Sequence, residues 1–364
     1  MPHLPPKSDT WYTQRLAPPT AQGPHPTSTG PASPSSKIRV IIDTDAANEI
    51  DDQFALAWAL LSPSQLDVVA VYAEPFSFAH RRVAYVAQHG AALDAAPFNP
   101  PAVGMERSYD EILTVYAKLG LPSKGKVYRG SAAYLKSATQ AVPSEAAEHL
   151  VATARAHRGS EPLYVVALGC VTNIASALLL APDIVDNIVV VWTSGFPSHA
   201  PQANLAFNLE QDLFASQILL DSGVPHVYLP GYHVGAQLRL SLPDMERYVQ
   251  GQGPMGDYLH QLYTHNPLWP VLGVKAEAAL QGVYSWVIWD IINIAWLLNP
   301  DWVPSTLVRT PVLTGDLFWQ AAPGRHWMRE AYGVQRDAIF ADLFGKLALH
   351  APTTATLNRR LSGC

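Results

Sequence analysis

The stretch VIIDTDAANEIDDQFALAWAL, residues 40–60, joins a run of β-branched residues to a segment with apolar residues at helical spacing. Asp43 and Asp45 stand two apart at the end of the predicted strand, so their side chains point to the same side. Asp51 and Asp52 fall in the first turn of the predicted helix. In an open α/β sheet, such a strand-to-helix junction is where ligands bind. The stretch therefore predicts a βα unit with carboxylates gathered at a binding edge.

Four aspartates at one junction repel one another and indicate a hard cation between them. The helix dipole stabilises one or two acids in a first turn, but not all four. Oxygen ligands suit Ca²⁺ or Mg²⁺, whereas zinc more often recruits His or Cys. The alternative is an acidic N-cap followed by an amphipathic helix whose Ile50, Phe54, Trp58 and Leu61 face the core. Asp-x-Asp combined with Asp-Asp favours the cation site.

Outward from this stretch, strand-like and helix-like segments alternate. The strand-like segments are 38–43, 66–73, 162–168, 186–192 and 225–230, and the helix-like ones are 50–61, 79–94, 172–181 and 213–223. Residues 241–300 are predicted to be mainly helical, at 241–249, 254–265 and 284–298, and a strand is predicted at 306–314. Near-continuous apolar strands are typical of a sheet covered on both faces. We expect an α/β fold with an open, mostly parallel, doubly wound sheet and helices on both faces.

Residues 1–36 differ in composition from the rest of the chain. They are rich in Pro, Ser, Thr and Gly, and such a segment buries too little apolar surface to offset the entropy of ordering. We expect a flexible extension over residues 1–36 and one α/β domain over 37–364, although Trp11 and Tyr12 could dock onto the body or a partner.

Composition excludes several classes of protein. Hydrophobic residues make up 48% and charged residues 15% of the 364 residues, as in compact enzymes. A net charge of -6 provides no basic surplus for nucleic acid. The two cysteines, Cys170 and Cys364, argue against disulfides and a zinc cluster, and no apolar run of membrane-spanning length or secretory signal is present. We expect a cytoplasmic protein that binds neither nucleic acid nor membrane.

Four sequence blocks together resemble the nucleoside hydrolase family, the inosine-uridine preferring nucleoside N-ribohydrolases, as a divergent member. DTDAANEIDD (43–52) is similar to the family signature Asp-x-Asp-Pro-Gly-x-Asp-Asp, with a two-residue insertion and without Pro-Gly. VALGCVTNIASAL (166–178), FNLEQDLFAS (207–216) and WDIINIAWLLNP (289–300) follow in the family's order. The resemblance covers residues 38–300 and implies a nucleoside hydrolase-like doubly wound fold.

The resemblance implies Ca²⁺-dependent hydrolysis of a ribonucleoside to free base and ribose. The metal ligands would be Asp45, Asp52, the backbone carbonyl of Thr172 and Asp290. Asp51 would be the general base for a calcium-bound water, and Asp43 would orient the ligands from behind. Asn208 would bind the ribose hydroxyls. The family also implies a homodimer or homotetramer.

On the base side, Trp289 stands where many family members have a His that protonates the leaving base. A Trp cannot supply a proton, but it could stack on a purine-like base or belong to the core. His80, His199, His233 and His265 are alternative acids. A purine or modified purine-like base is favoured.

On the ribose side, Ala206 replaces the Glu that the family places two residues before Asn208. Asn204 or Gln202 could substitute in contacting the sugar's 5′ position. Glu74 stands where the family has Gly-Asn after the second strand, either as a carboxylate at the pocket edge or exposed at a strand end.

Two other functions compete with hydrolysis of nucleosides. A catalytically weak nucleoside- or sugar-binding protein of the same fold would fit Trp289 and Ala206, but it would gain little from a positioned base. A haloacid dehalogenase-type phosphohydrolase would use Asp-x-Asp after a strand, but it leaves Asp51, Asp52 and the late Trp-Asp block unexplained.

Overall fold

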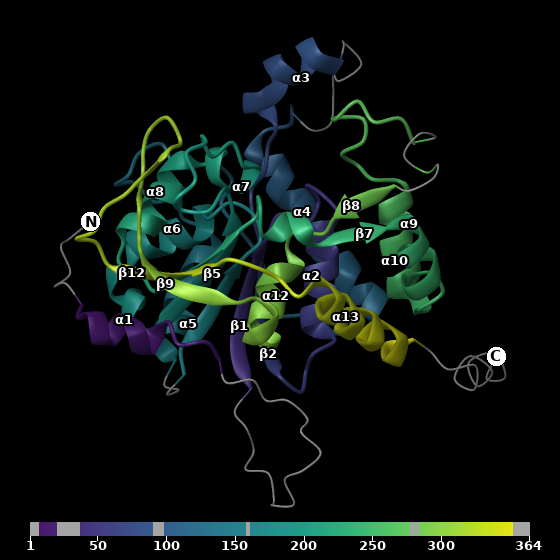
Figure 1. Cartoon of the computed structure of the whole chain (residues 1–364), viewed down its shortest axis with the longest axis horizontal. Helices are drawn as coiled ribbons and strands as arrows, with labels where there is room; N and C mark the ends of the chain where they lie inside the picture. The colour runs from purple at the N-terminus through teal and green to yellow at the C-terminus, as the bar shows by residue number, and fades with distance from the viewer. Residues whose placement is uncertain are drawn as a thin grey trace, which may run out of the picture.

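The computed structural model describes residues 7–19, 37–89, 98–157, 161–276, 280 and 284–351. Its centre is an eight-stranded sheet with the strand order β3-β2-β1-β4-β5-β6-β12-β9 (Figure 1). The strands are β1 (Ile38–Thr44), β2 (Leu66–Ala73), β3 (Val127–Arg129), β4 (Leu163–Ala167), β5 (Ile188–Ser194), β6 (His226–Pro230), β9 (Ser305–Arg309) and β12 (Trp327–Ala331). Every neighbouring pair is parallel except β12 and β9. The predicted fold class is confirmed.

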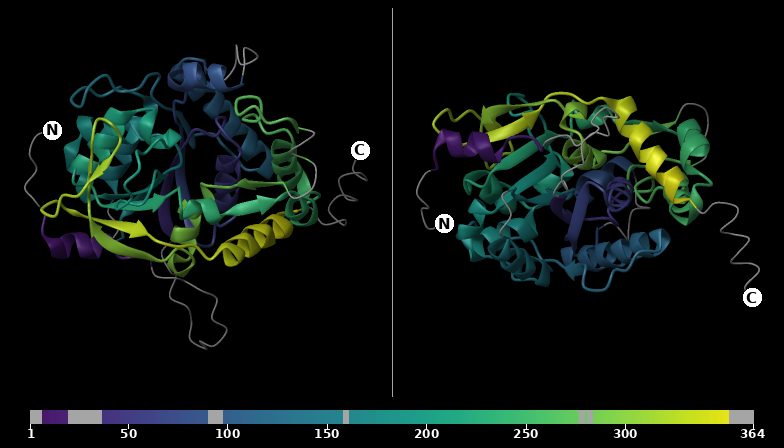
Figure 2. Two further views of the ribbon diagram at one scale, coloured as in Figure 1. Left: turned by 45° about the horizontal axis from the view of Figure 1, so that its top comes forward. Right: turned by 90° about the horizontal axis from the view of Figure 1, so that it is seen from below.

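Helices cover both faces of this sheet (Figure 2). One face packs against α2 (Asp51–Leu60), α4 (Pro101–Leu119) and α12 (Ile291–Leu298), with α10 (Gly253–Thr264) and α13 (Arg336–His350) outside them. The other packs against α5 (Glu145–Ala156), α6 (Thr172–Leu180) and α8 (Leu213–Asp221). Because successive strand residues point to opposite faces, Val40 and Ile42 enter the first core and Ile41 the second. The continuous apolar strands follow from this double burial.

The strand order reverses direction between β1 and β4, and this reversal places the site. From β1 the chain builds outward through β2 and β3, and from β4 it builds the other way through β5 and β6. A crevice therefore opens outside the carboxyl ends of β1 and β4. Asp43 near the end of β1 pairs with Ala167 at the end of β4, so Asp45 and Gly169 lie side by side beyond the sheet.

Two predicted elements were wrong in extent. The helix expected over 284–298 begins only at Ile291, because residues 285–287 form strand β8 (Ser285–Val287), which pairs antiparallel with β7 (Arg239–Ser241). Apolar spacing alone cannot separate a buried strand from a buried helix, and pairing with β7 decides the outcome. The strand expected over 306–314 is divided into β9 and β10 (Val312–Leu313), with Pro311 in the gap between them.

The helix expected over 79–94 is divided as well. It starts as the 3-10 turn η1 (Ala79–Arg81) and continues as α3 (Arg82–His89), and residues 90–94 lie outside the described residues. The segment 241–249 consists of a short helix α9 (Leu242–Asp244) and the π-helical turn η5 (Met245–Val249).

Part of the N-terminal segment is a docked helix, α1 (Asp9–Arg15). Tyr12 is only 3% exposed, and its hydroxyl donates to the Gly223 carbonyl at 2.7 Å. Asp9 pairs with Arg309 of β9, and the Leu16 carbonyl accepts from Arg329 of β12. The expected flexibility is therefore wrong for residues 9–15, because two buried apolar side chains outweigh the polar average of the segment. The rest of the extension, 1–6 and 20–36, lies outside the described residues.

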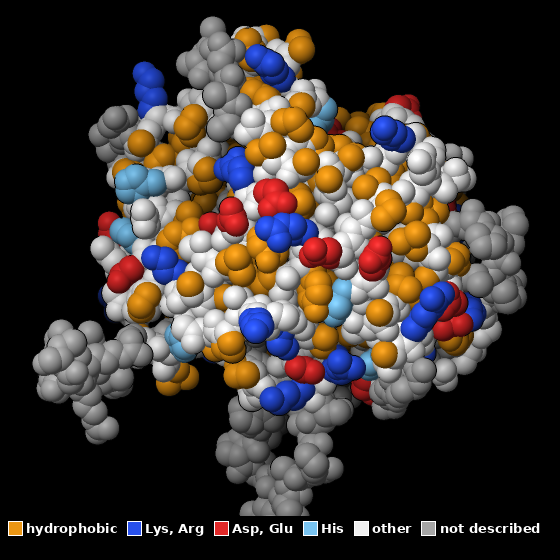
Figure 3. All heavy atoms as spheres, turned by 180° about the vertical axis from the view of Figure 1, so that it is seen from behind, with side chains coloured by type: hydrophobic (Ala, Val, Ile, Leu, Met, Phe, Trp, Pro, Cys, Tyr) orange, Lys and Arg blue, Asp and Glu red, His pale blue; other side chains and the backbone are white. Residues whose placement is uncertain are grey.

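The surface carries charge of both signs. Basic side chains on the face shown in Figure 3 are interspersed with acidic and apolar ones. Within the described part of the chain, no helix combines the length and the apolar character needed to cross a membrane.

Candidate active site

A cavity of about 420 Å³ opens at the carboxyl ends of β1, β4, β5 and β6. Its acidic lining residues are Asp45, Glu49, Asp51, Asp52 and Asp290. Its aromatic lining residues are Phe78, Tyr85, Phe207, Tyr232, Tyr284, Trp286 and Trp289. The aspartates are almost fully buried, so they occupy the deep end of the cavity. A pocket with carboxylates at its deep end and aromatic walls suits a small ligand that has one flat apolar part.

Three of these carboxylates form a compact cluster. Oxygen atoms of Asp51, Asp52 and Asp290 lie within 4.8 Å of one another, although the side chains are no more than 4% exposed. Asp51 and Asp52 are the first two residues of α2, and Asp290 is the N-cap of α12. Because both helices start at the cluster, their dipoles partly stabilise its negative charge.

Local hydrogen bonds orient these ligand atoms. The Thr44 hydroxyl, at the end of β1, donates to Asp52 Oδ1. Asn48 Nδ2 donates to Asp45 Oδ2 at 3.1 Å, and the Asn48 backbone N–H donates to the Asp45 carbonyl at 2.7 Å. The loop between β1 and α2 thereby fixes Asp45 beside the cluster. Sequence reasoning missed Asn48, although it lies inside the signature stretch.

The cluster lacks compensating positive charge. Burial raises the pKa of Asp52 to about 6, against the opposing hydrogen bond from Thr44. Burial raises the pKa values of Asp45, Asp51 and Asp290 well above the usual range, and the neighbouring carboxylates raise them further. In the described part of the chain no Lys or Arg forms an ion pair with these aspartates. An all-oxygen donor set with uncompensated charge fits a hard divalent cation.

A second carboxylate layer lies behind Asp45. Asp43 accepts a hydrogen bond from Asn173 Nδ2 at 2.8 Å, and burial raises its pKa to about 7. Glu74 is fully buried, and its carboxyl group lies within hydrogen-bonding range of the Asp43 carboxyl group. Burial and then the charge of Asp43 raise the pKa of Glu74 well above its usual value. Glu74 does not line the pocket and is not exposed, so it takes neither of the two expected places, the pocket edge or the exposed strand end.

Gly169 is the point at which these two layers come closest. A Cβ added there would lie 2.4 Å from Glu74 Oε2 and 2.5 Å from Asp45 Oδ1. We expect Gly169→Ala to displace both carboxyl groups and to lower the free energy of unfolding by about 1–3 kcal/mol, measured by urea denaturation. Gly345→Ala is the matched control, because a Cβ at this helical position meets open space. Equal stability of the two variants would contradict the packing described here.

Leu168, and not Thr172, lines the pocket that contains the cluster. Thr172 is the first residue of α6 and does not line the pocket, and its hydroxyl donates to Asp212 at 2.6 Å. Its carbonyl points into the helix that it starts. Leu168, at the end of β4, lines the pocket, and its carbonyl accepts from Asn208 Nδ2 at 2.6 Å. The family resemblance implies a metal-binding carbonyl at the start of α6, whereas the residue that lines the pocket follows the end of β4.

Of the residues expected to contact substrate, Asn208 and Trp289 line the pocket. Asn208 Nδ2 also donates to the Thr193 carbonyl at 3.2 Å, which fixes the amide across β4 and β5. Trp289 meets Tyr232 edge to face, with ring centroids 6.0 Å apart. Both side chains are therefore held by their surroundings.

Asn204 and His199 were expected to contact substrate, but neither lines the pocket. Asn204 is fully buried, where it accepts from the Phe196 N–H and donates to the Leu317 carbonyl. It closes a loop and is not available to a sugar. His199 is exposed on the surface. The other histidines considered as acids, His80, His233 and His265, do not line the pocket either.

Glu49 is a pocket residue that sequence reasoning missed as a site residue. It comes from the insertion within the signature stretch, and its Oε1 accepts a hydrogen bond from Trp286 Nε1 at 2.6 Å. Burial raises the pKa of Glu49 to about 8, the hydrogen bond from Trp286 opposes this rise, and Asp52 adds to it. An acidic residue between Asp45 and Asp51 was the feature of the sequence that could have identified Glu49 as a site residue.

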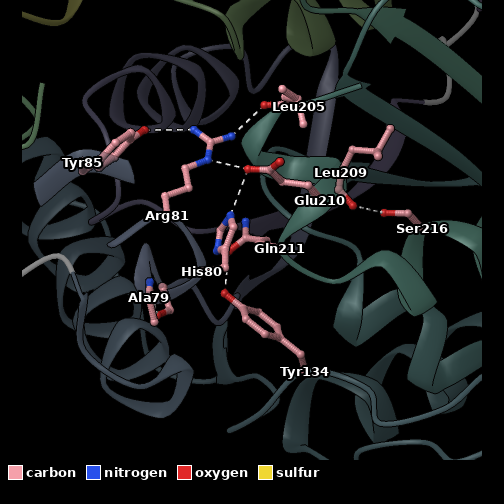
Figure 4. A network of polar contacts seen from close by, with 11 residues as sticks. Ala79, His80, Arg81, Tyr85, Tyr134, Leu205, Leu209, Glu210, Gln211 and Ser216 are labelled. Carbon is pink, nitrogen blue, oxygen red and sulfur yellow. Dashed lines mark hydrogen bonds and ion pairs between the residues drawn. The ribbon is translucent and has the colours of Figure 1, made fainter. Parts of the chain in front are cut away.

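An ion-pair network holds the rim of the pocket (Figure 4). Arg81 of η1 donates to Glu210, to the Leu205 carbonyl at 2.7 Å and to the Tyr85 hydroxyl at 3.1 Å. His80 also contacts Glu210, at 2.9 Å. Glu210 is in the short helix α7 (Phe207–Glu210), so the network ties the loop after β2 to the segment that carries Asn208.

The fold and site define an α/β protein with a cluster of buried carboxylates that could hold a cation at its topological switch point, and an aromatic-walled pocket above it. The model of the inosine-uridine preferring nucleoside hydrolase family matches residues 40–339. The chain belongs to this family, and it is accordingly a hydrolase of the N-glycosidase class. This membership leaves the phosphohydrolase alternative without support.

Three similar proteins share 14–25% sequence identity with this chain. The non-specific ribonucleoside hydrolase RihC of Salmonella enteritidis PT4 is 25% identical over 273 residues, which span 73% of this chain and 80% of that protein. The purine-preferring ribonucleoside hydrolase from Gardnerella vaginalis has the same fold, with a TM-score of 0.61, 18% identity and coverage of 86% and 99%. The type III effector XopQ, solved with adenosine diphosphate ribose, gives a TM-score of 0.60 at 14% identity, with coverage of 88% and 96%.

Proposed function

We propose that the protein hydrolyses the N-glycosidic bond of a ribonucleoside with a purine or purine-like base in a Ca²⁺-dependent reaction. The observation that carries this proposal is the buried cluster of uncompensated carboxylates at the deep end of an aromatic-walled pocket. Asp45, Asp52, Asp290 and the Leu168 carbonyl would hold the cation. When bound, the cation would supply Lewis-acid chemistry that polarises water and the ribose hydroxyls.

Asp51 is assigned as the general base. Asp51 is the carboxylate of the cluster that is not assigned to the cation. Its burial and its carboxylate neighbours raise its affinity for a proton. Asp51 takes a proton from the attacking water, whose oxygen bonds to the anomeric carbon as the bond to the base nitrogen breaks. The base leaves with the electron pair of that bond and takes up a proton from solvent. Positive charge develops on the sugar in this step, and the surrounding carboxylates stabilise it.

Asn208 and the aromatic residues are assigned to substrate binding. The Asn208 amide, fixed by two backbone carbonyls, presents its oxygen to the ribose hydroxyls. Trp289, set edge to face on Tyr232, offers a surface on which a flat base can stack. An extended aromatic wall favours the larger, purine-like bases.

Release of reducing sugar from a panel of purine, pyrimidine and modified nucleosides tests this function. We expect release from at least one purine-type nucleoside, faster than from uridine and cytidine, and loss of release after chelation. Recovery on adding Ca²⁺, compared with Mg²⁺, identifies the cation. Binding of nucleosides without sugar release would instead favour the binding-protein alternative.

A further inference from the structure

Glu49 is the carboxyl group of the pocket that the proposed chemistry does not use. Its Oε1 is fixed by the Trp286 indole N–H at 2.6 Å. Among the described residues, no hydrogen bond reaches its Oε2. Glu49 lines the pocket and is only partly buried, so a ligand can reach this oxygen.

The position of Glu49 follows from its partner. Trp286 is in β8, and Tyr284, Trp286 and Trp289 of this segment all line the pocket. The hydrogen bond therefore holds the carboxyl group of Glu49 at the aromatic wall. A flat base stacked on this wall presents the N–H groups of its ring edge beside the stacking surface.

We propose that Glu49 determines which base the pocket accepts, because Oε2 of the ionised carboxyl group accepts a hydrogen bond from an imide or amino N–H on the edge of the base. The proposal rests on the proposed hydrolase function. A base without such an N–H group leaves a largely desolvated acceptor unpaired and is therefore bound more weakly. The insertion in the signature stretch thereby adds a contact to the base from the same loop that orients the metal ligands.

The test compares Glu49→Leu with the wild type on substrates with and without this group. Adenosine and inosine carry an N–H on the base edge, whereas purine riboside and p-nitrophenyl β-D-ribofuranoside do not. We expect Glu49→Leu to lower kcat/KM for adenosine or inosine by about 10- to 100-fold and to lower it far less for the other two. An equal loss on all four substrates, or no loss, would overturn the assignment.

Two further variants distinguish loss of the hydrogen bond between Glu49 and the base from a general disturbance of the structure. Glu49→Gln replaces the free oxygen with a donor, so it should also penalise adenosine and inosine while it retains the acceptor for Trp286. Glu106→Leu makes the same change at an exposed site, where Glu106 pairs with Arg129, and should leave all four rates unchanged.

Binding of free bases gives a readout that is independent of catalysis. By calorimetry, 9-methyladenine or 9-methylhypoxanthine should bind the wild type more tightly than 9-methylpurine does, and both Glu49 variants should remove this preference. If the wild type cleaves no substrate, the proposed hydrolysis is refuted. The preference for bases with an N–H group on their edge would still test the role of Glu49 in binding the base. Absence of the preference in the wild type would refute that role.

Discussion

Asp51→Asn should lower kcat for nucleoside hydrolysis by on the order of 10³- to 10⁴-fold, at the upper end of what a positioned base contributes. The amide keeps the shape of the side chain but cannot take a proton from water. It also removes one buried carboxyl group from a cluster whose members raise one another's pKa values. The variant should therefore fold at least as stably as the wild type without added cation, as measured by urea denaturation.

The control for this variant separates a base from a metal ligand. Asp52→Asn should weaken Ca²⁺ binding in calorimetry, whereas Asp51→Asn should bind Ca²⁺ with affinity close to that of the wild type. Asp337→Asn makes the same change on a side chain that is 94% exposed and should not alter activity. Loss of Ca²⁺ binding in Asp51→Asn, or retention of full activity, would show that Asp51 is not the base.

Chelation should abolish activity and should destabilise the protein more at high pH than at low pH. Burial raises the pKa values of Asp52, Asp43 and Glu49 to about 6, 7 and 8, from ordinary values of 3.8, 3.8 and 4.5. Between about pH 4 and pH 8 the folded, cation-free protein therefore binds more protons than the unfolded chain. The free energy of unfolding then falls as pH rises through this window.

Calcium should reverse this loss, because it binds the ionised carboxylates of the folded state. At 100 times Kd a ligand that binds only the folded state adds about 2.7 kcal/mol, so the rise in Tm on adding Ca²⁺ should grow between pH 5 and pH 8. Thermal unfolding with and without chelator measures this rise. A stabilisation that does not change with pH, or that persists in Asp290→Asn, would contradict a cation site at this cluster.

Several elements of the first two thirds of the chain could be predicted from sequence because their burial is simple, whereas α4, β3 and α5 were not predicted. β1, β2, β4 and β5 are covered on both faces, so they are continuous apolar runs, and α2, α6 and α8 have expected lengths. Residues 284–290 could not be predicted, because an apolar run fits both a helix and a strand until its partner β7 is known.

Sequence alone placed Asp45, Asp51 and Asp52 together, since they lie at one junction between a strand and the next helix. The tertiary structure decided which residue lies beside them, and it brought Leu168 rather than Thr172 to the pocket because the end of β4, not the start of α6, borders the crevice. It also moved Glu74 behind Asp45, closed Asn204 into a loop and brought Glu49 to Trp286 across 237 residues of sequence. Local periodicity reports which residues are buried, whereas contacts between distant segments depend on strand order, which no local pattern encodes.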